Sequence, residues 1–323
     1  MTELDGAERL DPALRSIATT RTDFSLASIQ LMREPFNQRC RVAAEQIDAR
    51  GVQIVEDSAP TESGRVPVRI YGGGPSPAPV VVYCHAGGFT LGNLDTDHRQ
   101  CVELARRGRC TVVSVDYRLA PEHPYPAALE DASAVLRWVT SNATDLGVDA
   151  ARLAVAGSSA GATLAACLAH GAADGSLPAV VFQLLHQPVL DDRATASKAE
   201  FRTSPAFDSE AADLMWRYYL GAGAGPEAAI PARRDQLDGL PPALITCAEI
   251  DPFRDEAVNY ALLLLRAGVS AELHVFPRTC HGFDSLLPDW PISERLFALQ
   301  GHALSGAFHG SFKIGGAGLS PLL

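Results

Sequence analysis

Short apolar runs recur along the chain, and longer amphipathic segments separate several of them. Most of these runs are rich in Val, Ile and Leu, which is typical of strands buried on both faces of a sheet. The predicted strands cover residues 67–71, 80–84, 111–115, 153–156, 180–185, 243–247 and 272–276, and the clearest helical segments cover residues 127–140, 161–173 and 255–267. Strands that alternate with helices predict an α/β protein with a mostly parallel sheet.

Two regions depart from this alternation. Residues 1–50 have the periodicity of amphipathic helix and contain no predicted strand. Residues 190–235 form a long excursion between two predicted strands, with a helix expected at about 209–220 and Ser209 as its N-cap. Insertions of this length at one end of a sheet usually form a lid or a partner surface. Residues 311–323 are rich in Gly and Ser, and we expect a loosely ordered tail.

Composition narrows the class of protein. No internal repeat or low-complexity linker divides the 323 residues, which suit one large α/β domain. The 27 basic and 38 acidic residues give a net charge of −11, which argues against nucleic-acid partners. We find no secretory signal and no apolar run of about 18 residues, so we expect a cytoplasmic protein without a membrane span. The seven cysteines include no C-x-x-C pair and are expected to be free thiols.

The strongest chemical signal is Gly157-Ser158-Ser159-Ala160-Gly161, between a predicted strand and a helical run. A G-x-S-x-G in this context is a nucleophile elbow, whose strained backbone projects the serine Oγ above the sheet. Gly157 and Gly161 satisfy the need for small residues where strand and helix approach closely. Ser159 is therefore the candidate nucleophile, and Ala160 leaves its backbone N–H open to a ligand.

A second signal, His85-Ala86-Gly87-Gly88-Phe89, directly follows another predicted strand. Ester hydrolysis passes through a tetrahedral oxyanion, which requires backbone N–H donors held in place. A glycine-rich turn supplies such donors because no side chain blocks the approach. Together with the elbow, this turn is interpreted as an oxyanion loop instead of an ordinary connection.

An acid and a histidine follow in the chain order Ser, Asp or Glu, His of α/β-hydrolases. Asp251 comes after the sixth predicted strand and His281 after the seventh, both at the carboxyl edge of a parallel sheet, where catalytic groups collect. His281 would take the serine proton, and Asp251 would orient the imidazole. Glu249 and Asp255 are the competing carboxylates. His186, which also follows a strand, is a weaker candidate for the pocket.

No sequence pattern indicates a metal or a cofactor. There is no H-E-x-x-H motif and no Cys/His spacing that would close a tetrahedral metal site. The glycine-rich segment 221–225 follows a helix instead of a strand and lacks the dinucleotide-binding context. We expect neither a metal nor a cofactor.

Four blocks of the chain resemble the hormone-sensitive-lipase-like branch of the α/β-hydrolases, the bacterial family IV esterases. They are residues 85–89, residues 116–131 beginning Asp-Tyr-Arg-Leu-Ala-Pro-Glu-His-Pro, residues 157–161, and residues 251–256 followed by His281-Gly282-Phe283. The resemblance implies a single α/β-hydrolase domain over residues 1–323, with an eight-stranded core over about 51–189 and 236–310 and a helical cap from 1–50 and 190–235. The 116–131 block is the part most specific to that family.

By position, the resemblance also implies a catalytic triad and an oxyanion hole. The implied triad is Ser159, Asp251 and His281, and the implied oxyanion donors are the backbone N–H groups of Gly87, Gly88 and Ala160, with His85 supporting their loop. The family's usual His-Gly-Gly-Gly is His-Ala-Gly-Gly here, and a positive φ at Ala86 would cost about 1 kcal/mol. Ser158 replaces the usual acidic residue or Thr before the nucleophile. Because the two donor glycines are retained, we expect Ala86 to change the acyl or alcohol pocket more than the mechanism. We expect Ser158 to affect local hydrogen bonding and to leave the chemistry intact.

We therefore expect a serine carboxylesterase that hydrolyses small-molecule esters of short to medium chain length through an acyl-enzyme. Its expected pocket residues are Phe89, Ser158, Trp216 and Phe283. An amide, a lactone or an acetylated metabolite is an alternative substrate for the same triad. A non-catalytic receptor on the same fold is a third hypothesis, although no triad member is missing. The sequence leaves the oligomeric state open, a homodimer included.

Overall fold

The computed structural model describes residues 6–61, 64–221 and 226–310, and one eight-stranded sheet forms its centre. The strands are β1 (Gln53–Thr61), β2 (Gly64–Gly72), β3 (Ala78–Cys84), β4 (Thr111–Val115), β5 (Val148–Ser158), β6 (Phe182–His186), β7 (Ala243–Ile250) and β8 (Ala271–Cys280). Their order in the sheet is β1-β2-β4-β3-β5-β6-β7-β8. The β1–β2 and β2–β4 pairs are antiparallel and the others are parallel, which confirms the predicted mostly parallel sheet.

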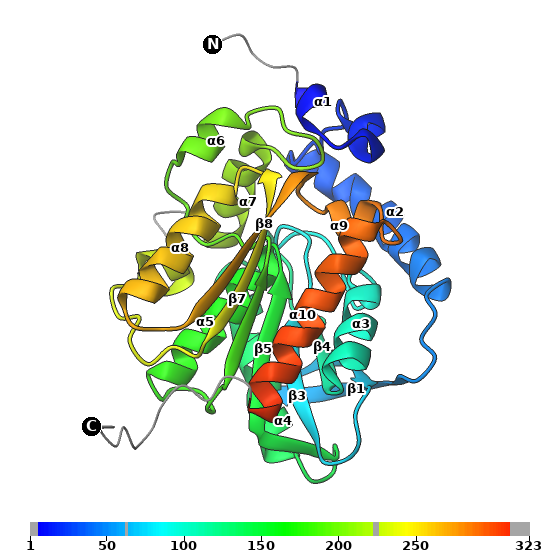
Figure 1. Ribbon diagram of the computed structural model, residues 1–323, viewed down its shortest axis with the longest axis vertical. Helices are drawn as coiled ribbons and strands as arrows, with labels where there is room; N and C mark the ends of the chain where they lie inside the picture. Colours follow the sequence, from blue (N-terminus) through cyan, green and yellow to red (C-terminus); the bar gives the residue numbers. More distant parts are fainter. Residues whose placement is uncertain (1–5, 62–63, 222–225, 311–323) are drawn as a thin grey trace, which may run out of the picture.

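Helices cover both faces of this sheet (Figure 1). One face carries α3 (His98–Gly108) and α10 (Pro291–His309), and the other carries α4 (Ala127–Ser141), α5 (Ala160–Ala173) and α8 (Arg254–Arg266). The short α9 (Phe283–Leu286) precedes α10. The three predicted helical segments are confirmed, since each corresponds to α4, α5 or α8 with ends that differ by one residue or less.

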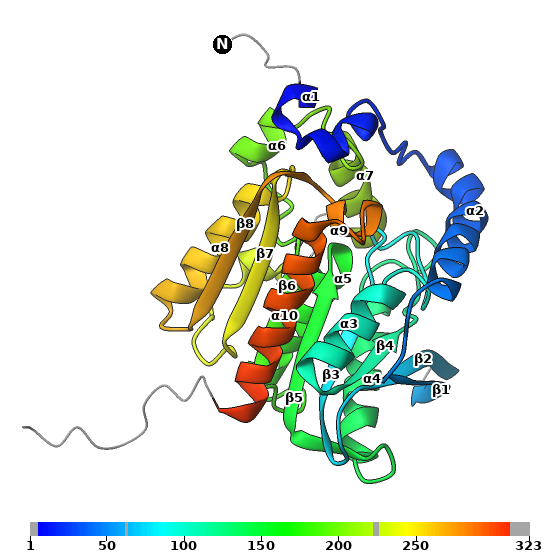
Figure 2. The ribbon, with the colours of Figure 1, turned by 45° about the vertical axis from the view of Figure 1, so that its right-hand side comes forward.

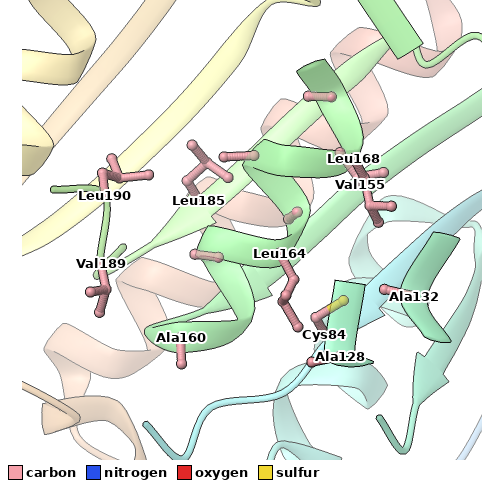
Figure 3. Close-up of a cluster of buried hydrophobic side chains, with 14 of the residues drawn as sticks. Cys84, Ala128, Ala132, Val155, Ala160, Leu164, Leu168, Leu185, Val189 and Leu190 are labelled. Atoms are coloured by element: carbon pink, nitrogen blue, oxygen red, sulfur yellow. The ribbon is translucent and has the colours of Figure 1, made fainter. Parts of the chain in front are cut away.

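The central strands are buried on both sides, as their continuous apolar composition predicts. Successive side chains of β3 point to opposite faces, so Val81 packs in the cluster under α3 and α10 while Val82 packs under α4 and α5. Figure 3 shows the second cluster, in which Leu164 of α5 lies close to Cys84 of β3 and Leu168 of α5 lies close to Val155 of β5. This packing fixes α5 along the face of the central strands, with its first residue, Ala160, at their carboxyl ends.

The N-terminal segment and the excursion after β6 meet at one end of the sheet. Before β1 the described residues form α1 (Gly6–Arg9), the 3₁₀ helix η1 (Pro12–Ile17) and α2 (Leu26–Glu45), and the excursion forms α6 (Ala196–Glu200), α7 (Ser209–Leu220), η2 (Glu227–Ala229) and η3 (Pro231–Arg233). Figure 2 shows α1, α6 and α7 gathered beyond the carboxyl ends of the parallel strands. Arg21 Nε donates to Asp208 Oδ2 at 2.7 Å, and the Ala206 N–H donates to the Thr20 carbonyl at 2.9 Å, so the two segments are joined directly.

Several local predictions need correction or addition. β5 begins at Val148, five residues earlier than predicted, and β8 ends at Cys280, four residues later than predicted. β1 was not predicted, because this edge strand is mostly exposed and only Ala59 is buried, so it lacks a buried apolar run. β6 begins at Phe182, two residues later than predicted. Helix α7 begins at Ser209 as expected, but the Ser209 N-cap was wrong: Asp208 is the N-cap, and its carboxylate accepts the Ala211 N–H at 3.0 Å. The predicted tail at 311–323 lies outside the described residues.

Two glycines allow α5 to approach the sheet closely. A Cβ atom on Gly161 would lie 2.0 Å from the Cys84 carbonyl oxygen and 2.4 Å from that of His85. A Cβ atom on Gly157 would lie 2.3 Å from the carbonyl oxygen of Gly161. These distances are far below van der Waals contact, so both positions require glycine, as the elbow predicts.

This close approach makes Gly161 sensitive to a single methyl group. We expect Gly161→Ala to lower the free energy of unfolding by about 1–3 kcal/mol, because the backbone of β3 must move to admit the Cβ atom. Gly72→Ala in β2 is the matched control, since its added Cβ would lie 3.8 Å from the nearest atoms; we expect a change below about 1 kcal/mol. Urea unfolding followed by circular dichroism measures both values. Equal losses in the two variants would contradict the steric argument.

Candidate active site

Ser159 lies at the sharp turn between β5 and α5. Its φ of 54° and ψ of −120° are unfavourable for a residue with a side chain, as a nucleophile elbow requires. The Ser159 N–H donates to the carbonyl of His186 at 2.8 Å, which holds the turn against the end of β6. Ser159 is only 6% exposed, so its hydroxyl is largely shielded from bulk solvent.

Three side chains form a continuous hydrogen-bonded chain at this turn. His281 Nε2 lies 2.9 Å from Ser159 Oγ, and His281 Nδ1 lies 2.8 Å from Asp251 Oδ2. Asp251 is fully buried, and its Oδ1 accepts the Phe253 N–H at 2.8 Å, so both carboxylate oxygens are hydrogen-bonded. An imidazole protonated at Nδ1 donates to Asp251 and accepts the serine hydroxyl, which is the arrangement that activates a serine nucleophile.

The two competing carboxylates have other partners. Glu249 Oε2 accepts the Arg278 N–H at 2.7 Å at the outer edge of the sheet. Asp255 Oδ2 accepts the Ser197 N–H at 2.7 Å and so fastens α6 to the loop that carries Asp251. Of the three carboxylates considered from the sequence, Asp251 is the one in contact with the histidine.

The turn after β3 and the start of α5 present backbone donors. Gly87 and Gly88 have φ values of 130° and 60°, and a Cβ atom on Gly87 would lie 2.0 Å from a carbonyl oxygen of its own turn. Gly161 packs against the carbonyl groups where this turn begins, so α5 and the turn are neighbours. Within residues 6–61, 64–221 and 226–310, the N–H groups of Gly87, Gly88 and Ala160 meet no hydrogen-bond acceptor. They are free to bind an external oxygen.

Ala86 is held at both ends in this turn. Its N–H donates to Asp97 Oδ2 at 2.8 Å, and its carbonyl accepts the Nδ1–H of His85 at 2.7 Å. Burial lowers the pKa of His85 to about 4, so the imidazole is neutral and stacks on Tyr117 at 4.2 Å. Ala86 does not adopt a positive φ, whereas Phe89 does at 60°. The strain considered for alanine at this position therefore does not arise.

An aromatic wall formed by Phe24, Phe207 and Phe253 stands beside the histidine. The Phe207 ring lies 5.5 Å from the His281 ring and 5.1 Å from Phe24, and the Phe253 ring lies 5.3 Å from His281. A Cβ atom on Gly88 would lie 2.5 Å from the Phe24 ring. Sequence reasoning missed Phe24 and Phe207, because only the tertiary structure brings their segments to the triad.

The four expected pocket residues lie in three different places. Phe89 stacks on Tyr219 at 3.8 Å and lies 6.0 Å from the Trp216 ring, so these two expected residues are together beside the glycine turn. Ser158 is the half-buried last residue of β5. Phe283 is fully buried and packs 5.3 Å from Phe276, in the apolar cluster beneath the loop of His281.

The corner after β6 contacts both halves of the site. His186 accepts the Ser159 N–H through its carbonyl, and its Nε2 lies 3.0 Å from Asp284 Oδ1. The side chain of Gln187, whose φ is 45°, accepts the Gly282 N–H at 2.5 Å, next to His281. The position of His186 after a strand was the available signal in the sequence, but its partners are visible only in three dimensions.

The described residues include no group of three or more His, Cys, Asp or Glu side chains placed to hold a metal ion. In the same residues, no helix is both long and apolar enough to cross a membrane. All seven cysteines are free thiols. The site thus combines a serine hydrogen-bonded to a histidine, a buried acid hydrogen-bonded to the same histidine, and backbone N–H donors nearby. This combination is suited to acyl transfer.

Comparison with known proteins identifies relatives of this chain. Residues 81–285 match the family described as alpha/beta hydrolase fold. The esterase LipI of Mycobacterium tuberculosis is 42% identical over 258 residues, which cover 77% of this chain and 81% of LipI. The carboxylesterase NlhH of the same species is 45% identical over 211 residues, 64% of this chain and 66% of NlhH.

Solved structures extend the similarity to nearly the whole chain. The crystal structure of esterase LipW from Mycobacterium marinum is 69% identical, covers 94% of this chain and 97% of its own, and superposes with a TM-score of 0.92. A structure described as a bacterial heroin esterase is 37% identical and superposes with a TM-score of 0.87. The match covers 93% of this chain and 98% of that structure's chain. Fold, sequence blocks and relatives agree, and the chain belongs to the α/β-hydrolases, in the hormone-sensitive-lipase-like family IV.

Proposed function

We propose that this chain is a serine carboxylesterase that hydrolyses short- to medium-chain esters, with Ser159, His281 and Asp251 as its triad. Hydrolysis of carboxylic esters is the activity named for its relatives LipN and NlhH. The observation that carries the proposal is the unbroken hydrogen-bonded chain from Ser159 Oγ through His281 to the buried Asp251.

In the first half-reaction, Ser159 Oγ attacks the ester carbonyl carbon while His281 Nε2 takes the hydroxyl proton. Asp251 stabilises the imidazolium that forms, through its hydrogen bond to Nδ1. The carbonyl oxygen becomes an oxyanion, which accepts hydrogen bonds from the backbone N–H groups of Gly87, Gly88 and Ala160. Collapse of this intermediate breaks the ester C–O bond, and the leaving alcohol takes the proton from His281.

In the second half-reaction, water replaces the alcohol. His281 Nε2 takes a proton from water as the water oxygen attacks the acyl carbon, and the same donors bind the second oxyanion. Collapse returns the proton to Ser159 Oγ and releases the carboxylic acid. The neutral His85 holds the Ala86 carbonyl, so the donor turn keeps its shape through both steps.

Residues 1–50 and 190–235 form the cap in this proposal, and residues 51–189 and 236–310 form the core. The joined segments stand over the carboxyl ends of the strands, and Phe24 and Phe207 bring one ring from each segment next to the triad. A wall of three phenylalanines favours acyl chains that fit beside His281 without displacing a ring.

Cytoplasmic location and a homodimer belong to the same proposal. Seven reduced cysteines suit a reducing compartment. Strand β8 is an edge of the sheet, and Val275 on β8 and Leu262 and Leu265 on α8 are exposed apolar residues that a second copy would cover.

The nucleophile assignment is tested by Ser159→Ala on p-nitrophenyl acetate, butyrate, octanoate and palmitate. We expect the wild type to hydrolyse the shorter esters and the variant to lose at least about 10⁴-fold in kcat, because no other group supplies the attacking oxygen. Ser141→Ala, at the exposed end of α4, is the matched control and should retain wild-type rates. A folded wild type with no more activity than Ser159→Ala would favour an amide-specific hydrolase or a receptor.

The aromatic wall predicts a change of acyl preference in Phe207→Ala. Removing this ring opens space beside His281, so the ratio of kcat/KM for octanoate to that for acetate should rise by about tenfold, within the ~1–3 kcal/mol that hydrophobic pocket contacts contribute. Phe308→Ala in α10 removes a buried ring from the other side of the sheet and controls for lost stability. An unchanged ratio in Phe207→Ala would contradict the role of the wall.

A further inference from the structure

Asp97 directly precedes α3, but its carboxylate does not cap that helix. An aspartate before a helix commonly accepts an N–H of the first turn, and here the side chain makes no such bond. Its Oδ2 instead accepts the Ala86 N–H at 2.8 Å and the Tyr83 hydroxyl at 3.0 Å. The residue is 8% exposed, so its carboxylate is directed inward at the turn after β3.

The hydrogen bond to Asp97 holds Ala86, and the backbone of Ala86 determines the direction of the Gly87 N–H. The carbonyl of Ala86 and the N–H of Gly87 belong to one planar trans peptide group and point in opposite directions. His85 fixes that carbonyl, and Asp97 fixes the preceding N–H, so both backbone torsions of Ala86 are held. The Gly87 N–H then has one orientation, away from the His85 ring.

The surroundings of the Asp97 carboxylate shift its pKa in opposing directions. Burial raises the pKa of Asp97 to about 6, against the two hydrogen bonds, which favour the charged form. Asp284 and His186 also act on the pKa of Asp97, the first raising it and the second lowering it. Above that pH the carboxylate is ionised, and an ionised acceptor binds an N–H about twice as strongly as a neutral one.

We propose that Asp97 is a positioning residue for the oxyanion hole, which holds Ala86 so that the Gly87 N–H is aligned with the developing oxyanion. This inference rests on the proposed function, in which Gly87 is an oxyanion donor. Asp97 touches neither the substrate nor the reacting atoms, and its effect passes through the Ala86 backbone. With Asp97 in place, the Gly87 N–H is aligned before substrate binds. Without Asp97, the N–H would have to be ordered during each turnover.

The simpler alternative is that Asp97 only ties the start of α3 to β3. The Tyr83 hydroxyl makes that tie on the same carboxylate oxygen, so Tyr83→Phe removes it and leaves the Ala86 bond in place. The two roles therefore separate in a set of variants. Asp97→Ala removes the acceptor, and Asp97→Leu removes it while filling the same space. Asp97→Asn keeps an amide oxygen as acceptor.

The experiment measures kcat and KM for p-nitrophenyl acetate at pH 8, with Ki for an alkyl trifluoromethyl ketone and a thermal midpoint for every variant. The ketone forms a tetrahedral adduct with the nucleophile, so its Ki reports on the oxyanion donors. For Asp97→Ala we expect kcat to fall ~10–100-fold, less than the ~10²–10³ lost with a whole donor. The KM should stay within about threefold of the wild-type value, and the Ki of the ketone should rise by the same factor by which kcat falls. Asp97→Asn should restore most of the wild-type kcat and of the affinity for the ketone. Tyr83→Phe should lose less than about threefold in kcat.

Each result bears on the inference. If Asp97→Ala unfolds, Asp97→Leu makes the same comparison. A folded variant without the acceptor that keeps wild-type kcat and Ki would overturn the positioning role, and so would an Asp97→Asn as impaired as Asp97→Ala. A loss in Tyr83→Phe equal to that in Asp97→Ala would assign Asp97 to the structural tie. Full activity in Ser159→Ala would reject the proposed function itself, whatever the Asp97 variants do.

Discussion

The close approach of α5 to β3 is the contact on which the rest of the site depends. Gly161 lies against the carbonyl oxygens of Cys84 and His85, where the glycine turn leaves the sheet. The same approach forces the chain from β5 into α5 within one residue, which explains the strained backbone of Ser159. Because α5 is packed along its length against the core, that strained turn has no low-energy alternative. One steric constraint thus aligns the nucleophile with the start of the donor turn.

Features with local causes could be predicted from the sequence, and features with tertiary causes could not. The buried strands and the elbow glycines follow from constraints that lie within a few residues of one another. The edge strand β1 has little buried surface and so little signal, and the choice of Asp208 over Ser209 as N-cap depends on how the chain enters α7. The pairing of Phe24 with Phe207 joins two distant segments, and no periodicity in either segment indicates it.

Buried charges in this protein fasten segments to the core. Lys198 of α6 is nearly buried, and its Nζ lies 2.9 Å from Glu256 Oε2 of α8. The other oxygen of Glu256 accepts the Leu190 N–H at 2.8 Å, so both ends of this stretch of the excursion are tied to one side chain. Burial raises the pKa of Glu256 to about 8 and Lys198 opposes that shift, so without Lys198 the Glu256 carboxyl would be protonated and would lose its ion-pair partner. The excursion is thereby anchored next to the loop that carries Asp251.

The origin of the aromatic wall in two separate segments has a consequence for how this enzyme can diversify. Phe24 and Phe207 touch each other as well as the site, so the space left by a change at one depends on the residue at the other. In the proposed function, acyl selectivity is then a joint property of the pair, and the effects of single substitutions do not sum. Among the described residues, neither segment contributes a strand to the sheet, so paired changes in these segments can alter the substrate range while the proposed triad and oxyanion donors stay unchanged.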